Sequence, residues 1–520
     1  MSLDPTDWAA VRAVGRRMVD DMLDYQETVR ERPPWRPVPA EVRARLDEPV
    51  PLEGAPLAEV YESFRRDVLP YPTGNIHPRF WGWVMGTGTP PGMLAEMLAA
   101  GMNAHLAGFD QSASLIEKQV LKWLKSLMGF PETASGLLVS GGTAANLNGL
   151  LAARAAKAGW DIREEGLHAG PPLTVYGSSE THSWATKACD TMGMGRAAFR
   201  QVAADTDYRL DLTACRAMIL ADRRAGLRPI AIIGNVGTVN TGAVDDLHGI
   251  RALSDELDLW FHIDGAFGSL AAWSPSRDLV AGQERADSIA FDLHKWGYMP
   301  YEVGVVLTRD ADAQLAAFGP HAGSAAYLLS LKQGVSADST YFADRGLQLS
   351  RGFRALKVWM SMKEQGVARI GAAIQANIDQ ARHLAGRIEG EPRLELLAPV
   401  SLNTVCFRYA GGSVPDERLD ALNQEILTEL QERGIAVPSH TILGGRFAIR
   451  VCITNHRSEL SDFDALVEAV LALGAEIVER GTDRVAVTGP QGQSHCASPA
   501  GKASRSRSHL KPSPEVEDES

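Results

Sequence analysis

The stretch Ser288-Ile-Ala-Phe-Asp-Leu-His294-Lys295-Trp296 is a run of apolar residues that ends abruptly in His-Lys-Trp. Such a short apolar run predicts a buried strand, which places Lys295 at its carboxyl end. Open α/β sheets bind their ligands at that edge. Burial there favours the uncharged amine, and a free amine can form a Schiff base with an aldehyde. Most lysines instead keep their ammonium group in water at the surface, so the rest of the chain must decide between these interpretations.

Apolar runs and helical patterns alternate on both sides of this stretch. The predicted strands are 137–139, 173–176, 230–234, 259–263, 289–291 and 303–307. This alternation predicts a mostly parallel sheet covered by helices. Farther along, the predicted elements are helices over 353–365 and 370–388, strands over 404–409 and 447–453, and a helix over 462–478. These later elements indicate a smaller α+β unit.

The chain is expected to divide into four parts. Residues 1–88 form a helical arm, with predicted helices at about 5–30 and 57–68, that packs on another subunit or domain. Residues 89–375 form the large α/β domain, and residues 376–483 form the small α+β domain. Residues 484–520 are rich in Gln, Ser, Pro and charged residues, so a disordered tail is expected there.

Composition narrows the class of protein further. The net charge of −12 argues against a general nucleic-acid binder. No apolar stretch is long enough for a membrane span, and no signal peptide is recognisable. The five cysteines are scattered without CxxC spacing, which argues against a disulfide framework or a zinc ribbon. A cytoplasmic protein is therefore expected.

Three further motifs place polar groups at the predicted strand ends. Ser140-Gly141-Gly142-Thr143 is a glycine turn between a strand and a helix, which suits a phosphate group. Asp264 ends a strand and can pair with a protonated ring nitrogen, while His182 can stack on a ring. Each motif alone also fits an ordinary turn, helix cap or surface histidine. Together with Lys295 they form a set that suits pyridoxal phosphate.

With these motifs in place, the chain resembles the group II pyridoxal-phosphate decarboxylases from about residue 10 to about residue 478. The matching segments are His77-Pro-x-Phe80, Ser140-Gly-Gly-Thr143, Glu180-Thr-His182-Ser, Gly237-Thr238-x-x-Thr-Gly-Ala-Val-Asp245, His262-Ile-Asp264-Gly-Ala266, His294-Lys295-Trp296, Leu349-Ser-Arg351-Gly-Phe-Arg-Ala-Leu-Lys-x-Trp359 and Phe447-x-x-Arg450. The resemblance implies the aspartate aminotransferase-like (fold type I) α/β architecture, with a mostly parallel central sheet, a helical arm and a smaller α+β domain. It also implies a homodimer with active sites at the subunit interface.

The resemblance implies a role for each matching residue. Lys295 holds the cofactor aldehyde, Asp264 faces the pyridine nitrogen, and Ala266 and His182 lie against the two faces of the ring. The implied phosphate-binding residues are Gly142 and Thr143, with His294 nearby, and Thr238 lies near the phenolic side.

The proton donor to the substrate carbon is expected from a loop tyrosine at Tyr327, with Tyr341 as a rival and His182 as an alternative. Candidate substrate contacts are the aromatic residues Phe80 and Trp83, together with Arg450 as partner of the substrate carboxylate. Ordinary packing or a structural ion pair would equally explain these three residues.

The expected reaction is decarboxylation of an L-α-amino acid, with an aromatic substrate leading. The alternatives are an acidic substrate (glutamate, aspartate or cysteine sulfinate), an aldehyde synthase or aminotransferase on the same scaffold, and a catalytically inactive regulator. Asp292 departs from the family, because aromatic decarboxylases carry asparagine near the phosphate at that position. A second anion there would repel the phosphate, so Asp292 is expected to point elsewhere.

Overall fold

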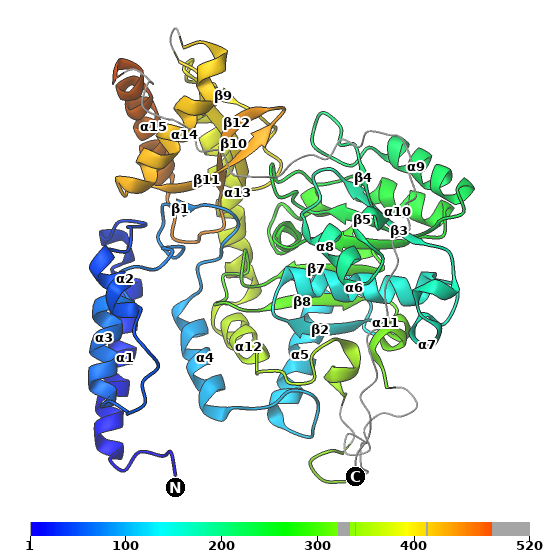
Figure 1. Ribbon diagram of the computed structural model, residues 1–520, viewed down its shortest axis with the longest axis horizontal. Helices are drawn as coiled ribbons and strands as arrows, with labels where there is room; N and C mark the ends of the chain where they lie inside the picture. Colours follow the sequence, from blue (N-terminus) through cyan, green and yellow to red (C-terminus); the bar gives the residue numbers. More distant parts are fainter. Residues whose placement is uncertain (1, 321–332, 338–339, 412–413, 481–520) are drawn as a thin grey trace, which may run out of the picture. The chain divides into compact units, whose positions relative to one another are not determined.

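Two β-sheets, each with its own apolar core, organise the chain (Figure 1). The computed structural model describes residues 2–320, 333–337, 340–411 and 414–480. The expected tail, 484–520, lies outside the described residues, and the expected domain boundaries stay a prediction. Among the described helices, none combines the length and apolar character needed to cross a membrane.

The large sheet has seven strands in the order β2-β8-β7-β6-β5-β3-β4. They are β2 (Ser135–Val139), β3 (Leu173–Ser178), β4 (Phe199–Val202), β5 (Arg228–Asn235), β6 (Trp260–Asp264), β7 (Ser288–Asp292) and β8 (Gly304–Thr308). Strand β8 runs antiparallel to its two neighbours, β2 and β7. The other neighbouring pairs, β7–β6, β6–β5, β5–β3 and β3–β4, are parallel. The predicted mostly parallel sheet is confirmed, with β4 as an additional edge strand.

Helices cover both faces of this sheet, because its strands present apolar side chains alternately to each face. On β5, Ile232 packs into the larger of two cores, and its neighbour Ile233 packs into the other. The helices around this sheet are α4 (Pro90–Met102), α5 (Ser112–Leu127), α6 (Gly142–Lys157), α7 (Ile162–Glu165), α8 (Trp184–Thr191), α9 (Leu212–Arg224), α10 (Leu247–Glu256), α11 (Ala311–Phe318) and α12 (Ala355–Gln365). Helix α6 contacts four strands, β5 to β8, and begins at the edge where the functional motifs lie.

The small sheet has the order β1-β11-β12-β10-β9. Its elements are β1 (Phe80–Trp81), β9 (Leu394–Leu396), β10 (Thr404–Tyr409), β11 (Val437–Leu443) and β12 (Arg446–Cys452), with helices α13 (Val367–Glu389), α14 (Asp416–Glu432) and α15 (Leu460–Arg480). Strand β1 comes from the N-terminal part of the chain and pairs in parallel with β11. Residues 80–81 thus belong to a sheet that is otherwise built from residues 394–452.

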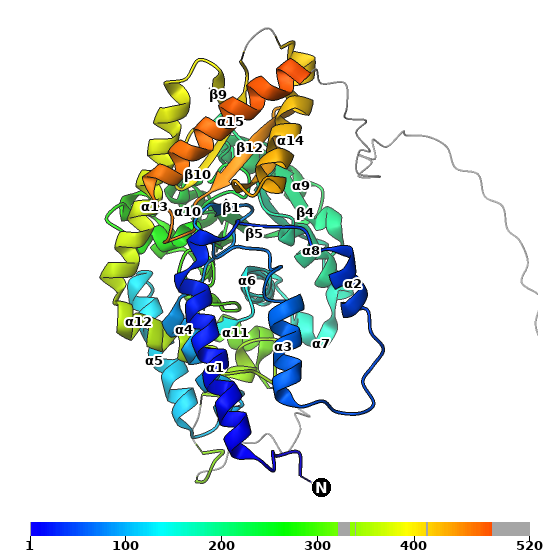
Figure 2. The ribbon, with the colours of Figure 1, turned by 90° about the vertical axis from the view of Figure 1, so that its left-hand side faces the viewer.

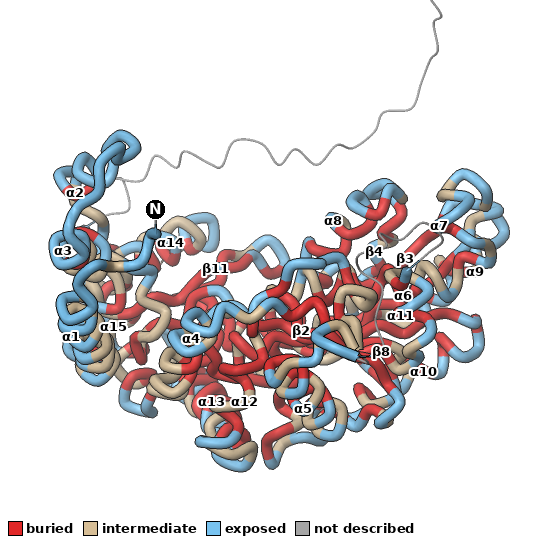
Figure 3. The backbone as a smooth tube through the Cα atoms, turned by 90° about the horizontal axis from the view of Figure 1, so that it is seen from below, coloured by how far each residue is buried: buried red, intermediate tan, exposed pale blue. Residues whose placement is uncertain are grey.

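The N-terminal arm consists of α1 (Trp8–Glu27), α2 (Ala40–Leu46) and α3 (Leu57–Asp67). Helices α1 and α3 lie side by side (Figure 2), joined by a 2.7 Å hydrogen bond from the Tyr61 hydroxyl to Asp21. None of the 20 residues of α1 is buried, and the arm is largely exposed in Figure 3. Both predicted helices of the arm are present.

Candidate active site

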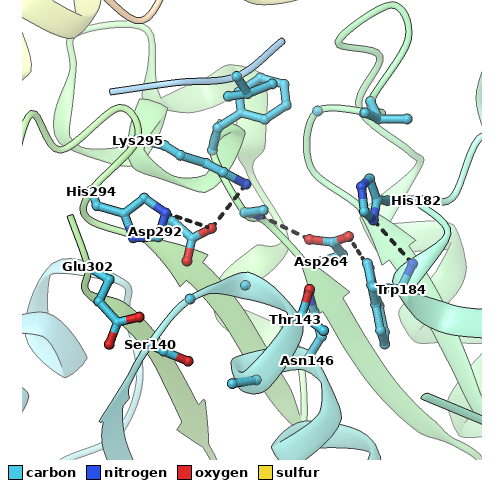
Figure 4. Close-up of a pocket in the computed structure, with 18 of the residues that line it drawn as sticks. Ser140, Thr143, Asn146, His182, Trp184, Asp264, Asp292, His294, Lys295 and Glu302 are labelled. Carbon is cyan, nitrogen blue, oxygen red and sulfur yellow. Dashed lines mark hydrogen bonds and ion pairs between the residues drawn. The ribbon is translucent and has the colours of Figure 1, made fainter. Parts of the chain in front are cut away.

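A cavity of about 400 Å³ opens at the carboxyl edge of the large sheet (Figure 4). Its walls come from the turn after β2, the start of α6, the loops that follow β3 and β5, and the ends of β6 and β7. Strands that are far apart in the sequence meet here because parallel strands end at the same edge of a sheet. The cavity therefore collects most of the polar motifs identified in the sequence.

The glycine turn between β2 and α6 leaves one wall of the cavity open to a ligand. No side chain caps the first turn of α6. A Cβ atom on Gly142 would lie 2.9 Å from Asp292 Oδ2 and 3.5 Å from Ala266 Cβ, so a side chain here would crowd both neighbours. Gly142 and Thr143 line the cavity with the N-terminal end of a 16-residue helix, where uncapped N–H groups attract anions.

Asp264 at the end of β6 is oriented by two donors. The Trp184 indole N–H donates to Oδ2 at 2.5 Å, and the Ala266 backbone N–H donates to Oδ1 at 3.1 Å. The residue is 6% exposed, so few other positions are open to its carboxylate. A fixed buried carboxylate of this kind can hold a cationic ring nitrogen.

His182 lines the cavity on the side of the loop after β3. The Trp184 backbone N–H donates to His182 Nδ1 at 3.2 Å, so Nε2 carries the proton of the neutral ring. Burial lowers the pKa of His182, and the nearby Asp264 opposes that shift in part. The imidazole is therefore neutral near neutral pH, as stacking on a cationic ring requires.

Lys295 and Asp292 form an ion pair inside the cavity, with 3.0 Å between Nζ and Oδ2. Burial alone lowers the pKa of Lys295, but the charge of Asp292 and its hydrogen bond outweigh burial and raise the pKa above its usual value. Two expectations were therefore wrong. Asp292 points into the cavity because the lysine ammonium attracts it, and Lys295 in this state is an ammonium group rather than a free amine.

The turn that carries Lys295 is fixed from two sides. The Trp296 indole N–H donates to Asn377 Oδ1 on α13 at 3.1 Å. The Val303 backbone N–H donates to His294 Nδ1 at 3.2 Å, and His294 Nε2 lies 3.7 Å from Asp292 Oδ2. These contacts hold Lys295 and Asp292 at a constant position relative to the glycine turn.

A comparison with known protein families identifies the chain. The family model described as "Pyridoxal-dependent decarboxylase conserved domain" matches residues 39–410. The chain belongs to this family. It is a pyridoxal-phosphate-dependent amino acid decarboxylase, and its α/β fold of type I is confirmed.

Individual relatives agree over most of the chain. An aromatic-L-amino-acid decarboxylase from Bacillus atrophaeus is 32% identical, covering 90% of this chain and 96% of the relative. An L-2,4-diaminobutyrate decarboxylase from Rhizobium meliloti is 31% identical, covering 82% of this chain and 85% of the relative. The crystal structure of Oryza sativa TDC with PLP and tryptamine has a TM-score of 0.83 at 27% identity, covering 91% of this chain and 99% of that chain.

The cavity residues of this decarboxylase fit pyridoxal phosphate. The glycine turn leaves room for a phosphate, Asp264 supplies a carboxylate for the ring nitrogen, and Lys295 supplies an amine for the aldehyde. Asn146 lines the cavity, and its Nδ2 is a buried donor that has no hydrogen-bond partner in the described part of the chain. Three acids line the described wall, Asp264, Asp292 and Glu302, and Asp292 lies against the glycine turn.

Several predicted site residues do not line the cavity. The Thr238 hydroxyl lies 3.0 Å from the Thr241 hydroxyl and accepts from the Ala243 N–H, so it serves its own loop. Phe80 is buried in β1, and Trp83 is 55% exposed outside the cavity. Tyr327 lies outside the described residues. Its rival Tyr341 packs edge-on against Phe109.

Arg450 also serves the backbone rather than the cavity wall. Its guanidinium donates to the carbonyl oxygens of Asn240 at 2.9 Å and Trp83 at 2.8 Å. It is 4% exposed on β12, where it joins the small sheet to two loops. In this structure it holds the loops next to the cavity and is not among the residues that line it.

The sequence interpretation missed some cavity residues. Trp184 stands two positions after His182 in the same turn, and its indole could have been recognised as a donor aimed at a neighbouring strand end. Asn235 ends β5 and Glu302 precedes β8, so a rule that every strand end faces the cavity would have found both. Val84, Val239 and Phe267 add apolar surface, and no local pattern marks them.

Proposed function

We propose that this enzyme decarboxylates an L-amino acid with an uncharged aromatic side chain. The observation that carries the proposal is the charge of the cavity. Among the described residues that line it, Lys295 is the only lysine or arginine, whereas Asp264, Asp292 and Glu302 are acids. A glutamate, aspartate or cysteine sulfinate side chain would meet repulsion there.

The apolar part of the wall supports an aromatic substrate. Val84, Val239 and Phe267 line the cavity beside the polar groups. The names of similar proteins point the same way, since they include an aromatic-L-amino-acid decarboxylase and a structure solved with tryptamine. The diaminobutyrate decarboxylase among them keeps a cationic side chain open as the second candidate, which the acidic wall also favours.

We assign the site residues as follows. Lys295 attaches the cofactor aldehyde, and Asp264, fixed by Trp184, keeps a proton at the ring nitrogen. The glycine turn with Thr143 binds the phosphate, and Ala266 and His182 flank the ring. When bound, pyridoxal phosphate supplies the electron sink that allows the bond between Cα and the carboxylate to break.

We propose that a side chain of the protein supplies the proton that replaces carbon dioxide at Cα. His182 is the described candidate, because its Nε2 carries the proton of a neutral ring on the cavity wall. Tyr327 remains the other candidate from the sequence. Exclusion of water and oxygen from the cavity would favour plain decarboxylation over the oxidative reaction that forms an aldehyde.

Mass spectrometry of the products tests this function. The cofactor-loaded enzyme is incubated in air with a panel of aromatic, acidic and basic L-amino acids. The expected product is an amine that is lighter than an aromatic substrate by one carbon dioxide. An aldehyde with ammonia and peroxide would replace decarboxylation by the oxidative reaction, and turnover of glutamate alone would contradict the substrate assignment.

We also propose that two copies assemble through the helical arm and complete each other's active site. None of the residues of α1 is buried, and Trp8 on α1 and Val60 on α3 are each 53% exposed. Removal of residues 1–70 is expected to abolish dimerisation in light scattering. A stable, active monomer would contradict this assembly. A cytoplasmic location fits the four described cysteines, which are all free thiols.

A further inference from the structure

Asp292 is the residue at which this cavity departs most clearly from a simple anion site. Its carboxylate is 1% exposed and lies against the glycine turn that the proposed function assigns to the phosphate. Oδ2 would be 2.9 Å from a Cβ on Gly142, and Oδ1 would be 2.7 Å from one on Gly304. The carboxylate thus packs closely against two glycines, where a side chain would crowd it.

The partners of this carboxylate are unequal. Oδ2 contacts the Lys295 ammonium, but Oδ1 is buried without a hydrogen-bond partner among the described residues. An unpaired buried carboxylate oxygen is costly, and a phosphate placed beside it would add repulsion. A carboxyl that carries a proton would instead donate a hydrogen bond to a phosphate oxygen.

Lys295 carries a proton that it must lose before it can react. Its contact with Asp292 keeps it as an ammonium, and an ammonium nitrogen has no lone pair with which to attack an aldehyde carbon. A single proton moved across the 3.0 Å between Nζ and Oδ2 removes both obstacles at once.

We propose that Asp292 takes the proton that Lys295 must lose when the cofactor binds, and then stands as a neutral carboxyl that donates to the cofactor phosphate. The balance is complete without another reactant. The ammonium gives one proton to the carboxylate, the amine nitrogen forms a bond to the aldehyde carbon, and the aldehyde oxygen leaves as water. The inference rests on the proposed role of Lys295 and adds a role for Asp292.

Other titratable groups around Asp292 bear on this proton transfer. Those on its own loop and on neighbouring elements are Lys295, His294, Asp264 at the end of β6, and Tyr301 and Glu302 before β8. Burial lowers the pKa of His294, so it is neutral near neutral pH. The glycine turn and Gly304 bring no titratable side chain. Apart from Lys295, these groups offer no permanent positive charge to keep Asp292 ionised beside a phosphate.

Pyridoxal, which lacks the phosphate, provides a matched probe. Equilibrium affinities of pyridoxal phosphate and pyridoxal are measured by absorbance between about pH 7 and pH 9, where the free phosphate has already lost its second proton. Both ligands react with the same lysine, so the ratio of their affinities isolates the phosphate. The proteins compared are the wild type, Asp292→Asn, and Glu302→Gln, which removes another acid of the cavity.

With pyridoxal, Asp292 has no phosphate to donate to and releases the proton to water, whereas with pyridoxal phosphate it keeps the proton. The preference of the wild type for pyridoxal phosphate is therefore expected to fall by up to about tenfold for each pH unit. The ratio should be constant in Asp292→Asn and should keep the wild-type slope in Glu302→Gln. Cofactor binding should also create the infrared band of a protonated carboxyl in the wild type but not in Asp292→Asn.

A constant ratio in the wild type, or an equal slope in Asp292→Asn, would overturn the proposal for Asp292. Failure of both ligands to form the lysine adduct with the folded wild type would instead overturn the role of Lys295. The two failures are therefore distinguishable.

Discussion

The cavity edge of the large sheet and the segment around β1 both carry motifs of aromatic and charged residues, but Phe80 and Trp83 of the β1 segment lie outside the cavity that the first region forms. At the cavity edge, the polar groups lie at the end of an apolar strand or in the turn after it, as Asp264 ends β6. Around β1, Trp81 packs against Phe463 with 4.7 Å between ring centroids. The packing partner of Trp81 thus comes from the last part of the chain. Motifs tied to a strand end can be interpreted locally, whereas motifs whose partners are distant cannot.

The strongest test of the cavity edge is Lys295→Ala. We expect no covalent cofactor and a loss of turnover of about a thousandfold or more, because the attacking amine is missing. Absorbance of the purified protein and product formation measure the two effects. Retained turnover with tightly bound cofactor would mean that Lys295 does not attach the cofactor and that the reaction takes place elsewhere.

The matching test of the β1 segment is Trp81→Ala. The side chain is 1% exposed and donates from its indole to Ser458, so its removal should cost about 3–5 kcal/mol of unfolding free energy. Chemical denaturation measures this loss, and Trp83→Ala, at a residue 55% exposed, is the control. Equal losses of unfolding free energy in both variants would mean that burial of Trp81 does not stabilise the protein more than the exposed Trp83 does.

A third prediction concerns pH and the buried core behind the cavity. Burial lowers the pKa of His262 to about 4, and the ring lies 2.8 Å from both Ser288 Oγ and Asn146 Oδ1. As pH falls from 6.5 to about 4, the unfolded chain takes up a proton that the folded chain refuses, so stability falls. His262 should contribute a loss of about 3 kcal/mol over that window.

Denaturation curves of the wild type and His262→Gln at several pH values measure this contribution as a difference in slope. Burial raises the pKa of Asp245 to about 6, which acts in the opposite direction but is common to both proteins. The exposed His440, changed to Gln, is the control. If His262→Gln keeps the wild-type slope, His262 does not govern this acid sensitivity.

The smallest expected effect is that of Trp184→Phe, which removes one donor from Asp264. A hydrogen bond to a charged group contributes about 2 kcal/mol, so kcat should fall about 30-fold while the fold persists. Steady-state kinetics and circular dichroism measure the two. An unchanged kcat would show that the Ala266 N–H alone orients the carboxylate.

Local patterns were sufficient to predict the core strands of the large sheet and two of the three arm helices, α1 and α3, but not α2. They missed β4, β9 and β11, because short or polar strands gain their stability from pairing with neighbours. In β11, Pro438 and His440 interrupt the apolar pattern, yet the strand pairs with β12 along its length from Ser439 to Leu443. Strand β1 was missed for the same reason.

For the site, the types of residue were predictable and their contacts were not. The glycine turn, His182, Asp264 and Lys295 all reach the cavity, since strand ends determine where they lie. The direction of Asp292 depends on a charge three residues away, and the Thr238 hydroxyl is taken by Thr241 in its own loop. Which partner such a side chain contacts depends on the three-dimensional arrangement of its neighbours, which local sequence patterns do not contain.

Strand β1 is synthesised well before β11, the strand with which it pairs. Phe80 and Trp81 leave the ribosome long before Val437 and Pro438, their partners in β11, have been made. Until then the N-terminal segment has an apolar strand with no sheet to join, and long-range pairing of this kind forms late. The newly made N-terminal segment is therefore expected to expose this apolar strand until the C-terminal part of the chain has been made.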